Sequence, residues 1–148
     1  MKEYINDYMK NVSKNFVRLQ KSTPDIEKAV NLIIDTLKNN RKIIFCGNGG
    51  SAGDSQHLAA ELMGRYKLDR NPLPALALTV DTSAITAIAN DYGYDKVFSR
   101  QLKGIGKEGD TLVAISTSGN SKSVIDAIKF ANENGINTIG LTGQKDSE

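Results

Sequence analysis

Two polar loops in this sequence combine glycine, serine and asparagine in a way that suits phosphate binding. The first runs Gly47-Asn48-Gly49-Gly50-Ser51-Ala52-Gly53, and the second runs Ser116-Thr117-Ser118-Gly119-Asn120-Ser121. Each loop follows a short apolar run and opens a stretch with helical periodicity. The first N–H groups of a helix have no intrahelical partner and the helix dipole is positive there, so such a loop can hold an anion without a cationic side chain. The sequence therefore predicts two anion-binding loops.

A histidine and a glutamate follow the first loop. His57 is the only histidine of the chain, and Glu61 lies four residues later, so both side chains lie on one face of a helix. The pair could bind a divalent metal, or Glu61 could act as a general base, although polar pairs at this spacing are also ordinary helix-surface features. A zinc site takes three or four protein ligands. Any metal site built on this pair is therefore incomplete or shared.

Strands and helices that would position these residues alternate along the chain. Apolar runs at 42–46, 73–80, 111–116 and 137–142 are separated by helical stretches, and their continuous hydrophobicity predicts parallel strands buried on both faces. Two helices are expected before the first strand, at 4–20 and from Thr23 to the Asn39-Asn40 pair. We therefore expect an α/β fold with a three-layer, open parallel sheet of flavodoxin-like strand order 2-1-3-4. In that order the first and third strands are neighbours, so the two loops would face each other.

Length and charge narrow the class of protein. The 148 residues suit a single domain, with N-terminal helices over 1–40 and an α/β core over 41–148. The 19 Lys and Arg are interleaved with 17 Asp and Glu, for a net charge of +2, so nucleic acid is not an expected partner. One cysteine, Cys46, ends an apolar run and is expected to be buried. The absence of a signal peptide or long apolar span favours the cytoplasm and no membrane association.

Three kinds of phosphate ligand compete for the loops. The spacing Gly47-x-Gly49-x-x-Ala52 weakly fits a dinucleotide fingerprint, but Asp81 lies too far along the chain to be its ribose-binding acid. Neither loop has the Gly-Lys-Ser/Thr of a Walker A sequence. A phosphorylated small molecule remains. Its phosphate would bind the Ser and Thr side chains of the second loop and the N–H groups of the helix that follows.

Several motifs together resemble one known family. They are Phe45 to His57, Ala59-Ala60-Glu61-Leu62, Ala87-Ile88-Ala89-Asn90-Asp91 and Ile115 to Ser121. This combination resembles the sedoheptulose-7-phosphate isomerases, also called phosphoheptose isomerases, within the sugar isomerase (SIS) fold. The resemblance covers the chain from its N-terminal helix to Thr142. It implies an aldose-ketose isomerase that converts sedoheptulose 7-phosphate to D-glycero-D-manno-heptose 7-phosphate for lipopolysaccharide or capsule.

The resemblance also implies roles for individual residues. Glu61 would be the catalytic base and, with His57, a ligand of one zinc ion per site. Further substrate contacts would come from Asn48, Gly49, Gly50, Ser51, Asn90, Asp91, Ser116, Thr117, Ser118 and Ser121. Moving a carbonyl from C2 to C1 through an enediol needs a carboxylate near both carbons and an electrophile on the oxygens, which fits these residue types. Members of the family are homotetramers whose active sites lie between subunits.

One departure from the family lies at the C-terminus. The family continues with a strand and helix that supply a glutamine and a histidine, the other metal ligands and the second acid/base group. This sequence stops at Lys145-Asp146-Ser147-Glu148, so we expect it to lack that strand and helix, either by truncation or by natural loss.

A second hypothesis is a non-catalytic SIS protein. It would be a phosphosugar-binding regulator or a protein-binding relative of the kind that associates with the replication initiator. Glu61, together with the full Gly-Asn-Gly-Gly-Ser-Ala-Gly run, favours the isomerase.

Overall fold

The first compact unit of the chain is helical. The computed structural model describes residues 1–143, and the chain divides into the units 1–32 and 33–148. The first unit holds α1 (Lys2–Leu19), the short 3₁₀ helix η1 (Gln20–Ser22) and the start of α2 (Thr23–Lys38). The Thr23 hydroxyl donates a hydrogen bond to the Gln20 carbonyl at 2.7 Å. The division falls inside α2, and the helices before the first strand extend to Lys38.

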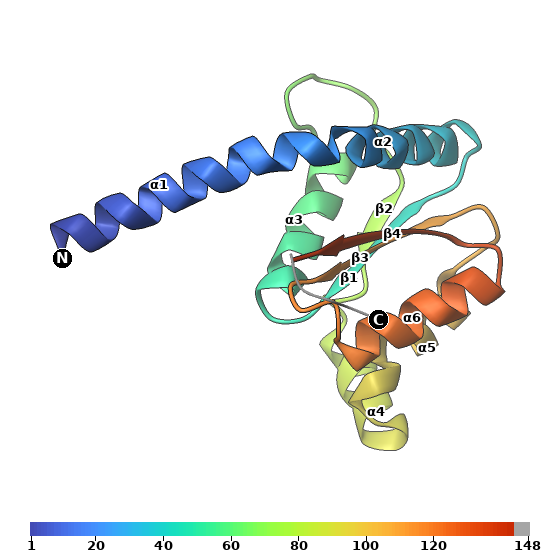
Figure 1. The fold of residues 1–148 in the computed structure, drawn as a ribbon. Coiled ribbons are helices and arrows are strands. Elements are labelled where there is room, and N and C mark those ends of the chain that lie inside the picture. The colour runs from blue at the N-terminus through green and yellow to red at the C-terminus, as the bar shows by residue number, and fades with distance from the viewer. Residues whose placement is uncertain (144–148) are drawn as a thin grey trace. The chain divides into compact units, whose positions relative to one another are not determined.

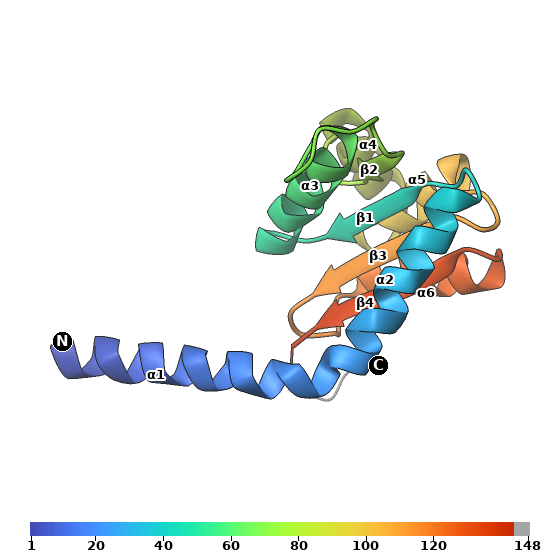
Figure 2. The same cartoon turned by 90° about the horizontal axis from the view of Figure 1, so that it is seen from above.

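The second unit holds a parallel sheet with helical crossovers. In chain order its elements are β1 (Ile43–Gly47), α3 (Gly50–Met63), β2 (Ala75–Ala77), α4 (Thr82–Tyr92), η2 (Tyr94–Lys96), α5 (Val97–Ile105), β3 (Thr111–Ser116), α6 (Lys122–Glu133) and β4 (Asn137–Thr142). Within the described residues the sheet has the order β2-β1-β3-β4, and every pairing is parallel. Figure 2 shows β1, β3 and β4 side by side with their arrowheads pointing the same way. The predicted strand order is confirmed.

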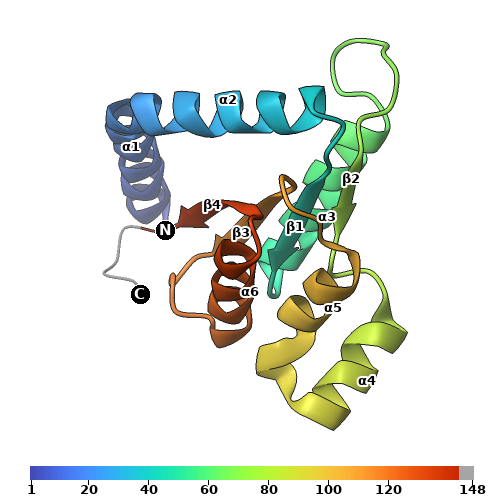
Figure 3. The ribbon, with the colours of Figure 1, turned by 90° about the vertical axis from the view of Figure 1, so that its right-hand side faces the viewer.

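Different helices cover the two faces of the sheet. Alternate residues of a strand point to opposite faces, so each strand contributes side chains to both layers of the core. Ile44 and Cys46 of β1 belong to a buried cluster that includes Phe98 and Leu102 of α5 and Ala127 of α6. On the other face, Ile43 and Phe45 of β1 cluster with Ala59 of α3 and with Ile33 and Leu37 of α2. Figure 1 shows α5 and α6 on the same side of the strands, and Figure 3 shows α4 beside α5. The three-layer arrangement is confirmed.

Two strands differ from their predictions. β2 spans three residues rather than 73–80. Pro74 just before it has no N–H for a ladder, and the chain turns away after Ala77. β4 has the predicted bounds, but its residues are half-buried or exposed, with Leu141 46% exposed. The expectation that all four strands are buried on both faces is therefore wrong for β4, because only Ile139 of its residues packs against a buried cluster of the described chain.

A buried carboxylate lies at the edge of the sheet where the strands begin. Asp110 is 1% exposed. It accepts hydrogen bonds from the backbone N–H groups of Lys42 at 3.0 Å and Lys107 at 2.8 Å, and from the Lys42 ammonium at 2.5 Å. This cluster ties the starts of β1 and β3 together and leaves the carboxyl edge to the polar loops. In the part of the chain that the structure describes, no helix combines the length and apolar character needed to cross a bilayer.

Candidate functional site

The first predicted loop is a tight turn between β1 and α3. Only Asn48 and Gly49 separate the two elements, because Gly50 to Gly53 already form the first helical turn. Gly49 has a φ of 58°, a left-handed conformation that glycine adopts without steric cost. The Ser51 N–H donates to the Asn48 carbonyl at 3.0 Å. The turn therefore presents the N-terminus of α3 at the carboxyl edge of the sheet, as an anion-binding loop requires.

The second predicted loop connects β3 to α6 and is ordered by its own hydroxyls. Ser116 and Ser121 share a hydrogen bond between their hydroxyl oxygens at 3.1 Å. The Asn120 N–H donates to the Ser118 hydroxyl at 3.2 Å, and Gly119 has a φ of 69°. Ser121 occupies the N-cap position of α6 without making a side-chain cap bond. The Val124 and Ile125 N–H groups donate to the Ser121 carbonyl, and its hydroxyl caps none of the N–H groups at the start of α6.

Asn48 joins the two loops. Its side-chain amide donates to the hydroxyl of Ser123, in the first turn of α6, at 3.0 Å. Its carbonyl oxygen accepts a hydrogen bond from the Tyr94 hydroxyl of η2 at 2.9 Å. On the far side of the second loop, the Gly143 N–H donates to the Thr117 carbonyl at 3.1 Å. The carboxyl ends of β1, β3 and β4 therefore converge, and the prediction that the two loops face each other is confirmed.

His57 and Glu61 form the predicted pair on α3. The His57 Nε2 and Glu61 Oε1 atoms are 3.4 Å apart, and the two side chains are 74% and 30% exposed. The helix runs back from the carboxyl edge, so Glu61 lies about 16 Å along its axis from Gly50 at 1.5 Å per residue. Within one copy of the chain, Glu61 is thus remote from the loop serines.

The last turn of α4 contains Asn90 and Asp91. The Asn90 amide donates to the Asp91 carboxylate at 2.9 Å. No hydrogen bond of the described residues connects either side chain to the two loops. They approach the loops only through the backbone that continues past Gly93 to Tyr94, which contacts Asn48. The predicted substrate contacts of Asn90 and Asp91 stay predictions.

His57 and Glu61 supply only part of the ligands that a metal site needs. Imidazole nitrogen and carboxylate oxygen suit zinc, but a zinc site takes three or four protein ligands. Among residues 1–143, no group of three or more His, Cys, Asp or Glu side chains is arranged to hold a metal ion. His57 and Glu61 therefore do not form a zinc site by themselves.

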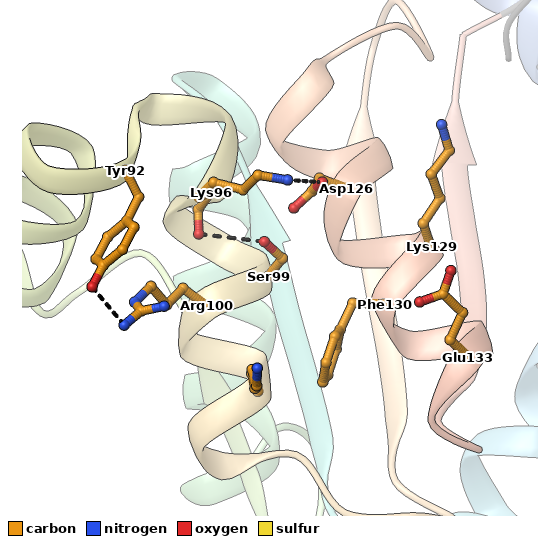
Figure 4. Close-up of a pocket in the computed structure, with 9 residues that line it drawn as sticks. Tyr92, Lys96, Ser99, Arg100, Asp126, Lys129, Phe130 and Glu133 are labelled. Carbon is orange, nitrogen blue, oxygen red and sulfur yellow. Dashed lines mark hydrogen bonds and ion pairs between the residues drawn. The ribbon is translucent and has the colours of Figure 1, made fainter.

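A pocket of about 520 Å³ lies between α5 and α6 (Figure 4) and includes none of the predicted residues. Lys96 pairs with Asp126 at 2.5 Å across it. Arg100 stacks 3.7 Å from the centroid of the Tyr92 ring and donates to the Tyr92 hydroxyl at 2.8 Å. Burial raises the pKa of Asp126, but hydrogen bonds from Lys96 and Ser99 and the Lys96 charge outweigh it, so the net pKa is below its usual value. These contacts hold η2 and α5 against α6, and α5 against α4.

Sequence reasoning missed the two residues that hold Asn48. Ser123 looks like an ordinary serine in a helical stretch, and Tyr94 follows Gly93 with no recognisable pattern. Both act through contacts between segments far apart in the chain. The one available signal was the polar character of Ser123 on an otherwise apolar helix face, where Val124, Ala127 and Ala131 are buried.

Comparison with known proteins identifies the family. A family model described as SIS domain matches residues 7–143. The chain is 55% identical over 148 residues to a phosphoheptose isomerase of Akkermansia muciniphila, covering 100% of this chain and 78% of that protein. It is 53% identical over 144 residues to a phosphoheptose isomerase of Campylobacter concisus, covering 97% and 76%.

Solved structures agree in both fold and sequence. A phosphoheptose isomerase from Francisella tularensis matches with a TM-score of 0.93 and 34% identity, over 98% of this chain and 76% of that one. The enzyme from Neisseria gonorrhoeae matches with a TM-score of 0.74 and 46% identity, over 93% and 76%. With a SIS-domain match over most of its length and relatives at about half identity, this chain belongs to the phosphoheptose isomerase family of SIS-domain proteins.

Proposed function

We propose that this protein isomerises sedoheptulose 7-phosphate to D-glycero-D-manno-heptose 7-phosphate, in the cytoplasm, for the heptose of lipopolysaccharide or capsule. The observation that carries the proposal is the Asn48 bridge, which links the start of α3 to the start of α6 at one edge of the sheet, where neither helix has a side-chain cap. The relatives at 55% and 53% identity are named phosphoheptose isomerases, which supports the same reaction here. They do not favour a non-catalytic SIS regulator.

The substrate phosphate would bind at the second loop. Thr117 and Ser118 are exposed there, and Ser121 is half-buried beside the first turn of α6. Backbone N–H groups at a helix N-terminus and neutral hydroxyls together satisfy phosphate oxygens. Gly49 and Gly50 leave room on the opposite side, since neither has an atom within 4 Å of where a side chain would begin. The sugar would then extend from the phosphate across the first loop.

The carbon chemistry would use Glu61 as the base. Its carboxylate would remove a proton from C1 of the ketose while O2 takes up a proton, which gives the C1=C2 enediol. The carboxylate would then return the proton to C2 while O1 loses its proton and becomes the carbonyl oxygen at C1. His57, 3.4 Å from Glu61, would orient the carboxylate. Atoms and electrons balance because the ketose and the aldose are isomers, so the step needs no oxidant or reductant.

We further propose that the active site is shared between copies of the chain in a homotetramer. The support is the axial separation of about 16 Å between Glu61 and the start of α3, which one copy cannot close. In a shared site, Glu61 of one subunit would approach the loops of its neighbour. The exposed apolar stripe of α1, which includes Tyr8 and Phe16 at 63% and 67% exposure, offers a surface for association.

Zinc binding would involve His57 and Glu61 together with ligands beyond residues 1–143 or from another subunit. Zinc supplies a Lewis acid to the oxygens of an enediolate. The two residues on α3 would contribute one nitrogen and one oxygen ligand, which is the donor chemistry that zinc accepts.

Replacing Glu61 tests the reaction directly. Glu61→Gln keeps the size and hydrogen bonding of the side chain but removes its ability to accept a proton, so turnover should fall by at least about 100-fold while substrate binding survives. The measurement is solvent deuterium incorporation at C1 or C2 by NMR, with binding followed by calorimetry. The protein should be expressed from its complete gene.

Two further variants separate the possible causes of that loss. His57→Asn removes a metal ligand but keeps the carboxylate, so exchange that survives in His57→Asn and is lost in Glu61→Gln assigns the proton to Glu61. Glu27→Gln, at an exposed position of α2, is the matched control and should exchange at the wild-type rate. Wild-type exchange in Glu61→Gln would remove Glu61 from the proposed chemistry.

A further inference from the structure

The loop between α3 and β2 (Figure 1) carries Arg70, whose side chain binds the C-terminal end of α3. Its Nη2 donates to the Glu61 carbonyl at 2.8 Å, and its Nη1 donates to the Leu62 carbonyl at 2.9 Å. The same Nη1 is 3.0 Å from the Asn71 carbonyl and 3.4 Å from the Gly64 carbonyl. One guanidinium thus connects the last turn of the helix to the loop that follows.

These bonds satisfy carbonyls that a helix end leaves without partners. The last four C=O groups of a helix have no intrahelical donor. Here the Gly64 N–H donates to the Ala60 carbonyl at 2.8 Å, while Arg70 supplies donors to the next two. A cation at this end is also favoured by the helix dipole. Arg70 therefore supplies a side-chain cap to the Glu61 and Leu62 carbonyls at the end of α3.

The loop that carries Arg70 is itself attached to the sheet. The Leu73 N–H donates to the Leu62 carbonyl at 3.0 Å, and the Pro74 carbonyl accepts from the Ile43 N–H of β1 at 3.0 Å. The last turn of α3 is therefore linked, through this loop, to the start of β1. Glu61 is in that turn, and its side chain is only 30% exposed.

We propose that Arg70 is a positioning residue for Glu61, an inference that rests on the proposed function of Glu61 as the base. Glu61 is three residues from the point where a helix frays, and the hydrogen bond to its own carbonyl fixes the backbone from which the carboxylate extends. A misplacement of about 1 Å in a catalytic group can cost about 100-fold in rate. Arg70 contacts the backbone of Glu61 and not its carboxylate, so it sets the position of the base without taking part in proton transfer.

The test uses Arg70→Lys and Arg70→Gln in the protein expressed from its complete gene. Lysine keeps the charge but lacks the planar fork that reaches two carbonyls together, and glutamine removes the charge as well. We expect kcat to fall about tenfold in Arg70→Lys and about 10- to 100-fold in Arg70→Gln, with KM changed less than about threefold. Amide hydrogen exchange should speed up in the last turn of α3 and stay unchanged in β3.

Lys67→Gln is the matched control. Lys67 is a basic residue of the same loop, and its ammonium lies 5.5 Å from the centroid of the Tyr66 ring, away from the carbonyls of α3. This variant should keep the wild-type kcat and exchange pattern. If Arg70→Gln does not fold, Arg70→Lys decides alone.

The outcomes separate this inference from the proposed function. Loss of deuterium exchange in Glu61→Gln with unchanged kcat in folded Arg70 variants would overturn the positioning role and leave the base assignment intact. Wild-type exchange in Glu61→Gln would remove the proposed function, whatever the Arg70 variants do. A fall in thermal stability of the Arg70 variants with no fall in kcat would assign Arg70 to the fold alone, and would also overturn the inference.

Discussion

Gly47 shows how one residue determines the geometry of the site. A Cβ placed there would lie 2.7 Å from both the Cβ and the carbonyl oxygen of Ser51, well inside van der Waals contact. The first turn of α3 therefore passes directly over the end of β1, which any larger residue would prevent. This close approach allows Asn48, the next residue, to reach Ser123 of α6. A glycine without a side chain thus contributes to the site by letting two elements touch.

Cys46 gives a prediction at the same scale. Burial raises the pKa of its thiol to about 12. The thiolate is the reactive form, so the native protein should not react with a disulfide reagent such as DTNB between pH 7 and 9. We expect stoichiometric labelling only after unfolding in urea. The absorbance of the thiol released from the reagent measures the extent of labelling. Prompt labelling of the native protein would show that Cys46 is accessible, contrary to its 0% exposure.

Single residues with local roles were predictable, and residues with distant partners were not. The burial of Cys46 follows from its place at the end of an apolar run, and the pairing of His57 with Glu61 follows from helical periodicity. The bonds of Asn48 to Ser123 and Tyr94, and of Arg70 to α3, join segments that no periodicity relates. Such contacts depend on how the crossovers return to the sheet.

Among the elements, the strands that fill a whole apolar run were predicted most accurately. β3 and β4 have the predicted bounds. The apolar run of β3 ends at a polar loop, and the run of β4 begins after a short turn from α6. β2 is shorter than its run, since pairing with β1 involves only Ala75 to Ala77. The exposure of β4 was not predictable from its own residues, because burial of a strand depends on what covers it.

The hydroxyls before α6 should contribute to the affinity for the substrate phosphate. Replacing Ser118 and Ser121 together with alanine removes two hydroxyls but leaves the helix N–H groups in place. We expect affinity for sedoheptulose 7-phosphate to fall about 10- to 100-fold, since a hydrogen bond to a charged group contributes about 1.5–3 kcal/mol and part is recovered by water. Calorimetric titration measures the change, and circular dichroism checks the fold.

Ser22→Ala in η1 serves as the control for that double substitution. Ser22 is a half-buried serine of the first compact unit, and its replacement should leave affinity unchanged. Unchanged affinity in the Ser118/Ser121 double variant would place the phosphate elsewhere on the protein.

At the scale of the whole molecule, the exposed face of α1 predicts self-association. Tyr4, Tyr8, Val12 and Phe16 recur at helical spacing, and no residue of α1 is buried. An apolar stripe of this kind is favourable only when another surface covers it. Light scattering at micromolar concentration should show an oligomer, and Tyr8→Ser with Phe16→Ser should lower its order. Lys14→Gln, a polar substitution on the same helix, should not. A monomeric wild-type chain would contradict both the association and the shared site.

Mixed oligomers test whether the site is shared. If Glu61 of one subunit serves the loops of another, co-expressing Glu61→Gln with the Ser118/Ser121 double variant should restore activity at roughly a quarter of the sites by random assortment. At a substrate concentration well below the Kd of the double variant, each variant alone should be nearly inactive. Failure of the mixture to recover activity, in an oligomer shown to contain both chains, would confine each site to a single subunit.

The pairing pattern of the sheet also affects the order in which the chain can fold during synthesis. β1 is made first of the four strands, yet Ile43 must pair with both Ala75 and Thr111, and Thr111 in turn pairs with Asn137. Every pairing in the sheet thus closes a long loop, and such non-local contacts slow folding. While α3 to α5 are being translated, one edge of β1 has no partner and its apolar face is uncovered. Until β3 has been synthesised, the nascent chain therefore carries an unpaired strand edge and uncovered apolar surface, which are the features that make folding intermediates prone to aggregation.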